Sequence, residues 1–235
     1  VQGRYDFIIN CIGLLSSQIN GTNSESVQNA VLINGLFPHQ LSKLAQNNDA
    51  RVIHMSTDGV FSRNAGMCLE ESQQNYDDLY GKTKSIGEVF EKNFLNLRCS
   101  IIGPNPFNRR GIFEWFLSQP NDTDVCGYTN HMWNGVTTLQ FSNLCKYLIV
   151  EDSFDMVVKE SSVHHFCPNL PISKFELLKL FKIIFRPNIN LKSDLSPDGP
   201  MNRILGTQYN NLSKIFGYGK HMKDAIYELF KHLKK

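Results

Sequence analysis

Short apolar runs alternate with longer segments of helical periodicity along the first half of the chain. Three apolar runs, residues 5–13, 51–55 and 94–102, predict buried strands. The segments 24–47 and 80–90 repeat apolar residues at helical spacing and predict helices between these strands. Strands that alternate with helices form parallel sheets with helices on both faces. The pattern therefore predicts an α/β fold with a doubly wound parallel sheet.

The pattern changes near Gly103, where the second half of the chain begins. Helices are predicted from residue 112, over 138–148, after a capping box at Ser173 and Glu176, and at the C-terminal end. Residues 186–211 are rich in Asn, Asp, Pro and Gly, which predicts a long irregular loop. We expect residues 1–102 to carry the sheet domain and residues 103–235 to form mainly a smaller lobe, whose segments can interleave with the sheet.

The stretch from Ser56 to Lys84 carries the candidate chemistry. Ligands of a parallel α/β sheet collect beyond the carboxyl ends of its strands, and Thr57 directly follows the predicted strand 51–55. Tyr80 and Lys84 are four residues apart in the predicted helix, so they project from the same face. We expect Asp77 or Asp78 to be the N-cap of this helix. These positions bring a hydroxyl, a phenol and an amine to one edge of the sheet.

Together these three groups suit hydride transfer to a carbonyl. The pKa of a free phenol is about 10, and a neighbouring ammonium lowers it. Such a tyrosine can exchange a proton with a carbonyl oxygen that a threonine hydroxyl holds in place. The Tyr-x-x-x-Lys spacing alone is weak evidence for a catalytic site. Tyr227 and Lys231 have the same spacing in a C-terminal helix, where we expect only a surface pair. The preceding strand and the Ser-Thr at its end favour a catalytic interpretation of the first copy.

The segment Ser56-Thr57-Asp58-Gly59-Val60-Phe61, followed by Tyr80-x-x-x-Lys84, resembles the extended short-chain dehydrogenase/reductases, and most closely their dTDP-4-dehydrorhamnose reductase branch. The resemblance is specific over residues 5 to about 150. It implies a Rossmann-like domain, NADP or NAD as cofactor, and reduction of a 4-keto nucleotide sugar in cell-surface polysaccharide or deoxysugar synthesis. It also implies that Thr57, Tyr80 and Lys84 form the catalytic triad.

The resemblance places the cofactor along the ends of the predicted strands. The implied contacts are Asn10, Cys11, Ile12, Gly13, Asn34, Ser56, Tyr80, Lys84 and Ile102. In the wider family, an asparagine in the position of Asn34 has a free main-chain carbonyl that holds a water in the proton relay. Pro38 lacks the N–H that would bond this carbonyl, which gives a local reason for the same freedom; a simple kink with a solvated Asn34 is the equal alternative.

Five residues are candidates for substrate binding: Asp58, Asn105, Arg109, Arg110 and Trp133. The arginines have the forked donors that suit a diphosphate, although an ordinary surface loop is the alternative for this turn. Trp133 suits stacking on a sugar, or else a half-buried packing role. Two residues depart from what is common in the rhamnose reductase branch: Ile101 stands in place of a tryptophan, and Gly59 in place of a tyrosine. The identity of the sugar in the substrate therefore stays open.

Other features narrow the class of protein. The net charge of +2 argues against a nucleic-acid partner, and no apolar run is long enough to span a bilayer. The six cysteines contain no C-x-x-C pair and indicate buried, reduced thiols in a cytoplasmic protein. We expect no metal: His164 and His165 are adjacent on a predicted strand and face opposite sides. The adjacent carboxylates of Glu70 and Glu71 predict a solvated loop face. A homodimer remains an open expectation.

The sequence contains no glycine-rich turn of the type that binds a dinucleotide pyrophosphate. We therefore expect the first part of the nucleotide-binding domain to be missing, and the 235-residue segment alone to bind nicotinamide dinucleotides weakly and to associate. Two alternative functions stay open. One is a nucleotide-sugar epimerase or dehydratase, which shares the triad. The other is a non-catalytic binding or regulatory member of this fold, such as the regulatory subunit of methionine adenosyltransferase.

Overall fold

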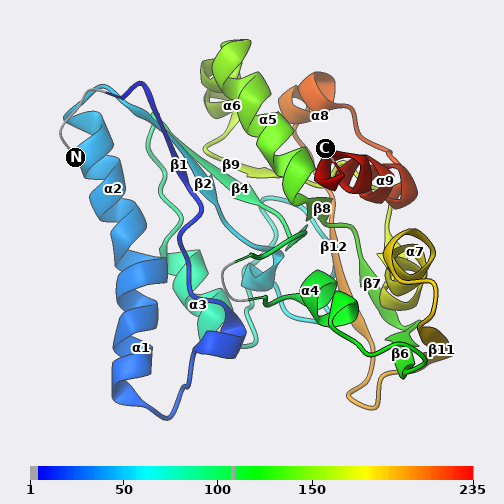
Figure 1. The fold of residues 1–235 in the computed structure, drawn as a ribbon. Coiled ribbons are helices and arrows are strands. Elements are labelled where there is room, and N and C mark those ends of the chain that lie inside the picture. Colours follow the sequence, from blue (N-terminus) through cyan, green and yellow to red (C-terminus); the bar gives the residue numbers. More distant parts are fainter. Residues whose placement is uncertain (1–4, 107–108, 235) are drawn as a thin grey trace.

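The fold is built on a four-stranded parallel sheet. A computed structural model describes residues 5–106 and 109–234. The strands follow the order β1 (Phe7–Asn10), β2 (Arg51–Met55), β4 (Phe94–Arg98) and β9 (Val163–His165), and each pairs in parallel with its neighbour (Figure 1). Among the described strands, β1 pairs with β2 alone. The predicted α/β fold with a parallel sheet is confirmed.

Two strands are shorter than the apolar pattern predicts. The run 5–13 leaves the sheet after Asn10, whose side-chain oxygen accepts the Ile12 N–H and turns the chain. The run 94–102 is divided, because Ile101–Ile102 forms a separate strand, β5, that pairs with β8 (Val136–Thr137). Apolar composition continues through both breaks, so periodicity alone does not locate them.

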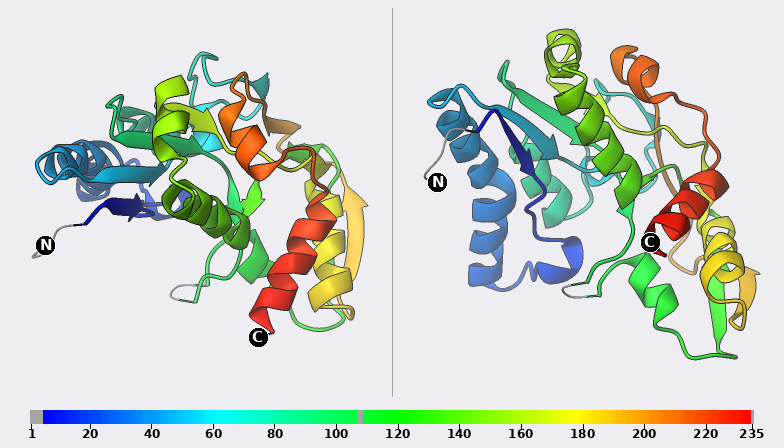
Figure 2. Two further views of the ribbon diagram at one scale, coloured as in Figure 1. Left: turned by 90° about the horizontal axis from the view of Figure 1, so that it is seen from above. Right: turned by 45° about the horizontal axis from the view of Figure 1, so that its top comes forward.

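Helices α1 (Ser24–Ala30), η2 (Val31–Leu36), α2 (Phe37–Gln46) and α3 (Leu79–Ile86) cover one face of the sheet (Figures 1 and 2). The predicted helix 24–47 is therefore interrupted, and η2 is a π-helix just before Pro38. Leu41 and Ala45 of α2 pack on Val52 and Phe94 in the core of this face. The predicted helix 80–90 ends earlier, because Gly87 caps α3.

Helices α5 (Thr138–Val150), α6 (Phe154–Glu160) and α8 (Asn211–Phe216) lie on the other face (Figure 2). Their core contacts reach the sheet through Ile53, Leu95 and Leu97, all fully buried. Thr137 caps α5 and forms a capping box with Gln140. The central sheet is thus buried on both faces, as parallel sheets require.

The remaining strands form smaller sheets that join distant parts of the chain. One has the order β10 (Ile172–Ser173), β7 (His131–Trp133), β12 (Met201–Leu205) and β3 (Gly66–Cys68); a second pairs β6 (Asp124–Tyr128) with β11 (Asn190–Asp194). Helices α4 (Ile112–Leu117), α7 (Lys174–Phe185) and α9 (Met222–Leu233) pack against them around a second core. The predicted capping box of α7 is present, with Ser173 as N-cap and Glu176 as its partner.

The prediction of an irregular loop over 186–211 is wrong, because this segment contains β11 and β12. Each strand pairs with a partner at least 60 residues away in the sequence, and neither has a clean alternation of apolar residues. Within the described ranges, no helix is long and apolar enough to cross a membrane, and no group of side chains could hold a metal ion. All six cysteines are free thiols, with Cys11 and Cys126 exposed and the others buried.

Candidate active site

A cavity of about 380 Å³ opens where β1, β2 and β4 end. Its walls come from the segment after β1, the end of β2, helix α3 and the segment after β4. The lining residues are Cys11, Ile12, Gly13, Leu14, Leu15, Ser16, Ser17, Met55, Ser56, Thr57, Asp58, Tyr80, Lys84, Cys99, Ser100 and Ile101. The structure therefore brings Thr57, Tyr80 and Lys84 together on one cavity, at the edge of the sheet where their positions in the sequence predicted them.

Thr57 is held by the short turn that follows β2. Its Oγ1 accepts the Gly59 N–H at 3.0 Å and caps the 3₁₀ turn η3 (Asp58–Val60). The same hydroxyl donates to Asp58 Oδ1 at 3.2 Å. Both residues are buried, and burial raises the pKa of the Asp58 carboxyl. These bonds fix the Thr57 hydroxyl in the cavity wall.

Tyr80 lies in the first turn of α3, next to Thr57. The N-cap of this helix is Asp78, whose side chain accepts the Gly81 N–H at 2.8 Å. Burial raises the pKa of the Tyr80 phenol to about 12, against an opposing effect of the Thr57 hydroxyl. A neighbouring ammonium predicts the opposite direction, a lowered pKa. Loss of hydration dominates in this structure, so the Tyr80 phenol is protonated near neutral pH.

Close packing of α3 on the η3 turn places Tyr80 beside Thr57. A Cβ added to Gly81 would lie 2.1 Å from the carbonyl oxygen of Gly59 and 2.7 Å from Cβ of Tyr76. No side chain fits between these backbones. Glycine at position 81 therefore sets the distance between the helix that carries Tyr80 and the turn that carries Thr57.

Lys84 is buried at the floor of the cavity. Its Nζ donates to the carbonyl oxygen of Met55 at 2.7 Å and lies 3.4 Å from Nε2 of His54. Burial lowers the pKa of the amine to about 8, against an opposing effect of Glu88, Cys99 and Cys11. The ammonium and the amine of Lys84 are thus close in free energy near neutral pH.

The predicted cofactor residues are divided between the cavity wall and the layer behind it. Cys11, Ile12, Gly13, Ser56, Tyr80 and Lys84 line the cavity. Asn10 is buried behind the wall, and Ile102 belongs to the second core. A Cβ added to Gly13 would lie 3.4 Å from Oδ1 of Asn34 and 4.0 Å from Nζ of Lys84. The small residues, hydroxyls and amine of this wall suit one end of a dinucleotide.

Asn34 acts through its side chain, which the sequence did not predict. Its Oδ1 accepts the Leu14 N–H at 2.8 Å and its Nδ2 donates to the Leu14 carbonyl at 3.0 Å. Nδ2 also lies 3.2 Å from Thr83 Oγ1 on α3. The main-chain carbonyl packs against Gly87, where a Cβ would lie 2.0 Å from the oxygen. Asn34 therefore ties the loop after β1 to helix α3. The water relay stays a prediction.

The predicted substrate residues are dispersed, apart from Asp58. Trp133 is only 3% exposed and lies in the second core with the Lys174 amine over its ring, so its placement fits the packing alternative. Arg110 lines a neighbouring hollow together with Leu14 and Ser17. Asn105 accepts the Arg109 N–H, in the turn before α4. Phe107 and Asn108 of this turn lie outside the described residues.

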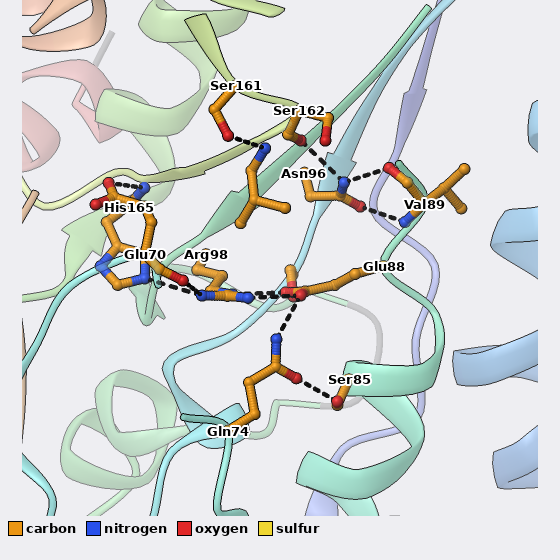
Figure 3. Close-up of polar contacts among 12 residues, drawn as sticks. Glu70, Gln74, Ser85, Glu88, Val89, Asn96, Arg98, Ser161, Ser162 and His165 are labelled. Carbon is orange, nitrogen blue, oxygen red and sulfur yellow. Dashed lines mark hydrogen bonds and ion pairs between the residues drawn. The ribbon is translucent and has the colours of Figure 1, made fainter. Parts of the chain in front are cut away.

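Arg98 and Glu88 form a buried ion pair (Figure 3). Arg98 at the end of β4 binds Glu88 through two N–H···O contacts of 2.7 Å, and both side chains are at most 3% exposed. Glu88 also accepts the Ser56 hydroxyl at 2.8 Å, and Gln74 donates to its second oxygen at 2.9 Å. The pair thus links the end of α3 to the residue before Thr57. The sequence did not predict this network.

Glu70 belongs to the same buried region, so the prediction of a solvated loop face is wrong at this position. The Glu70 carboxylate accepts hydrogen bonds from the backbone N–H groups of His165 and Gln208 and from the Thr207 hydroxyl, and Arg98 donates to the Glu70 main-chain carbonyl. Glu71 is exposed, as predicted. His164 and His165 are both buried in β9, in agreement with the prediction of a strand.

Residues 3–102 match the family model of the RmlD substrate binding domain. No curated protein matches the sequence of the chain. Among solved structures, a dTDP-4-dehydrorhamnose reductase from Clostridium acetobutylicum is 17% identical with a TM-score of 0.75, and the match covers 98% of this chain and 81% of that one. The reductase from Bacillus anthracis, in complex with NADP, is 15% identical with a TM-score of 0.74, covering 97% and 81%.

An ADP-L-glycero-D-manno-heptose-6-epimerase from Helicobacter pylori is also similar, with 12% identity and a TM-score of 0.73 over 99% of this chain and 74% of that chain. The family match confirms the resemblance that the Ser-Thr-Asp and Tyr-x-x-x-Lys motifs indicated. The structural matches confirm the Rossmann-type fold. Reductases and an epimerase share the fold at similar scores, so the fold alone does not separate these two reactions.

Proposed function

We propose that the protein is an NAD(P)H-dependent reductase of a 4-keto nucleotide sugar. The observation that carries this proposal is the meeting of Thr57, Tyr80 and Lys84 on one cavity at the carboxyl ends of three parallel strands. The match of residues 3–102 to the RmlD family and the fold shared with dTDP-4-dehydrorhamnose reductases support the choice of substrate class. The reduced nicotinamide, when bound, supplies the hydride.

Each member of the triad has a role that its environment supports. Tyr80 is protonated and donates its proton to the ketone oxygen as the carbonyl carbon gains hydride. Thr57 holds that oxygen by turning its single O–H from Asp58 to the ketone, while the Gly59 N–H keeps its Oγ1 in place. Lys84 grips the ribose and restores the Tyr80 proton. The ketone thus becomes an alcohol, with one hydride and one proton added and one reduced cofactor consumed.

The wall after β1 is the proposed cofactor site. Cys11, Ile12 and Gly13 bring small side chains and backbone to the cavity, and Ser56 and Lys84 complete its inner surface. Asn10 and Asn34 support this wall from behind. On the substrate side we retain Asp58 in the cavity and Arg110 beside it. The other predicted substrate residues, Asn105, Arg109 and Trp133, and the predicted cofactor residue Ile102 stay proposals that this arrangement does not favour.

Tyr80→Phe tests the triad directly. The substitution removes the proton donor while it preserves the ring, so we expect turnover to fall at least about 100-fold with nearly unchanged cofactor affinity. Tyr227→Phe is the matched control, because Tyr227 precedes Lys231 at the same spacing on the half-exposed face of α9. Turnover by Tyr80→Phe at the wild-type rate in the full-length protein would refute the assignment.

An epimerase or dehydratase is the second candidate, because the heptose epimerase of Helicobacter pylori shares the fold. Such enzymes return the hydride to the same substrate, so they consume no reduced cofactor. A non-catalytic binding protein is the third, and it predicts that no candidate nucleotide sugar is converted. Candidate sugars incubated with and without added reduced cofactor separate these three functions.

A further inference from the structure

His54 is a buried titratable group next to the triad that the proposed mechanism does not use. It lies in β2 and is fully buried, with its ring 5.7 Å from that of Phe94. Each ring nitrogen faces one polar side chain. Nδ1 lies 2.9 Å from Nδ2 of Asn10, and Nε2 lies 3.4 Å from Nζ of Lys84. The ring thus bridges the end of β1 and the catalytic helix.

The Asn10 amide determines which nitrogen of His54 carries the proton. Its Oδ1 accepts the Ile12 N–H at 3.1 Å, so the amide oxygen faces the backbone and the NH₂ group faces His54. An NH₂ group can only donate, which makes Nδ1 of His54 the acceptor. Burial and the nearby Lys84 hold the pKa of His54 well below its usual range, so the ring is neutral. A neutral imidazole with a bare Nδ1 carries its proton on Nε2.

The Nε2–H of His54 therefore points at the amine of Lys84. An ammonium has donors only, so in that form two N–H groups would face each other. In the neutral amine, the lone pair accepts the His54 N–H while an amine N–H still donates to the Met55 carbonyl. We propose that His54 is a positioning residue that holds Lys84 as the acceptor of its Nε2–H, in a tautomer that Asn10 fixes.

The other groups around this contact do not replace it. Glu88 and the Cys99 and Cys11 thiols act on Lys84 in the opposite direction and favour the ammonium. His39 of α2 also lowers the pKa of His54. The tautomer of His54 therefore adds to the burial that already lowers the pKa of Lys84. An ammonium that gives up its proton easily can pass it toward Tyr80, and the amine that remains regains a proton from water. This use of Lys84 rests on the proposed function, whereas the tautomer does not.

The tautomer can be read directly by NMR on the full-length protein with ¹⁵N-labelled histidine. Spectra that correlate ring protons with ring nitrogens distinguish a protonated from a bare nitrogen, and loss of a signal in His54→Gln assigns it. We expect the Nε2–H tautomer for His54 above about pH 8, where the amine form of Lys84 predominates. His165 is the internal reference, because its Nδ1 faces the Gly206 carbonyl at 2.7 Å and must carry the proton. A His54 signal with Nδ1–H, or with both nitrogens protonated, would overturn the proposal.

Asn10→Asp tests the role of the amide. A carboxylate accepts the Ile12 N–H with one oxygen and presents a second acceptor to Nδ1, so His54 should change to the Nδ1–H tautomer. The bare Nε2 of His54 then accepts a hydrogen bond from the Lys84 ammonium, so the pKa of Lys84 should rise by about one unit. The ¹³C chemical shift of the Lys84 ε-carbon, recorded against pH, measures this change. An unchanged His54 tautomer, with the His165 signals intact, would contradict the account. Neither measurement needs substrate or cofactor, so failure of the proposed function leaves both readouts intact.

Discussion

At the scale of single residues, burial sets the protonation of the proposed triad. Tyr80 and Lys84 both lose hydration at the floor of the cavity, which raises the pKa of the phenol to about 12 and lowers that of the amine to about 8. Loss of hydration shifts both groups toward their uncharged forms, so the phenol stays protonated and Lys84 gives up its proton near pH 8. Catalysis in this account therefore begins from a protonated tyrosine and a lysine that exchanges protons easily, rather than from a phenolate stabilised by an ammonium.

Lys84→Met should reveal this burial as a pH-dependent difference in stability. Between about pH 8 and pH 10.5 the unfolded chain still binds the lysine proton while the native protein has released it, so rising pH favours the native wild type. Relative to Lys84→Met, the wild type should gain about 1.4 kcal/mol per pH unit across this window. Urea unfolding at pH 7, 8 and 9 measures it. A difference between the two proteins that stays constant with pH would show that Lys84 is not desolvated.

The residues that the sequence located are those whose role is local. The Thr57, Tyr80 and Lys84 motif and the Asp78 cap depend on a strand, a turn and one helix, all within residues 51–86. The Glu88–Arg98 pair and the His54 contacts could not be found in this way, because a buried charge and an exposed one look alike in a sequence. The side-chain role of Asn34 was missed for a similar reason: its partner Leu14 lies 20 residues away.

At the scale of elements, the position of α3 determines whether the site is assembled. The helix packs closely on the η3 turn through Gly81 and on η2 through Gly87. Strand β2 and the Ser173 cap were predictable, since both have strong local patterns. Strands β11 and β12 were not, because their pairing with β6, β7 and β3 is decided by contacts that no local pattern records.

Gly81→Ala should push α3 away from the η3 turn. The new Cβ would meet the Gly59 backbone at 2.1 Å, and we expect a loss of about 1–3 kcal/mol in the free energy of unfolding together with a marked fall in turnover. Gly21→Ala is the control, since a Cβ there meets nothing within 4 Å. Thermal unfolding and cofactor oxidation assays give the two readouts. Full activity in Gly81→Ala would mean that close packing of α3 is not what places Tyr80.

The Glu88–Arg98 pair should be important for stability because it is buried. Removing one partner leaves an unpaired buried charge, so Arg98→Met should cost about 3–5 kcal/mol, and the double variant Glu88→Gln/Arg98→Met should recover part of this loss. Arg51→Met is the matched control. Arg51 pairs with Asp155 at 2.6 Å on the surface, where a pair contributes about 1 kcal/mol or less. Equal losses for Arg98→Met and Arg51→Met, measured by urea unfolding, would contradict the role given to the buried network.

At the scale of the whole molecule, segments from both halves of the chain build each part. Strand β9 from the second half completes the central sheet, and β3 from the first half joins the sheet of β7 and β12 (Figure 1). The cavity lies where the first three strands of the central sheet end, with β5 and its partner β8 beside it. The alternation of strands and helices was sufficient to predict the parallel sheet, whereas this exchange of strands depends on long-range pairing.

The stoichiometry of reduced cofactor tests the central claim most directly. The full-length protein is incubated with a 4-keto nucleotide sugar and NADPH or NADH, the nicotinamide absorbance is followed, and the sugar product is identified. The account predicts one reduced cofactor oxidised for each ketone converted to an alcohol, and no oxidation with Tyr80→Phe. Conversion of the sugar without net loss of reduced cofactor, or no conversion of any candidate sugar, would contradict it.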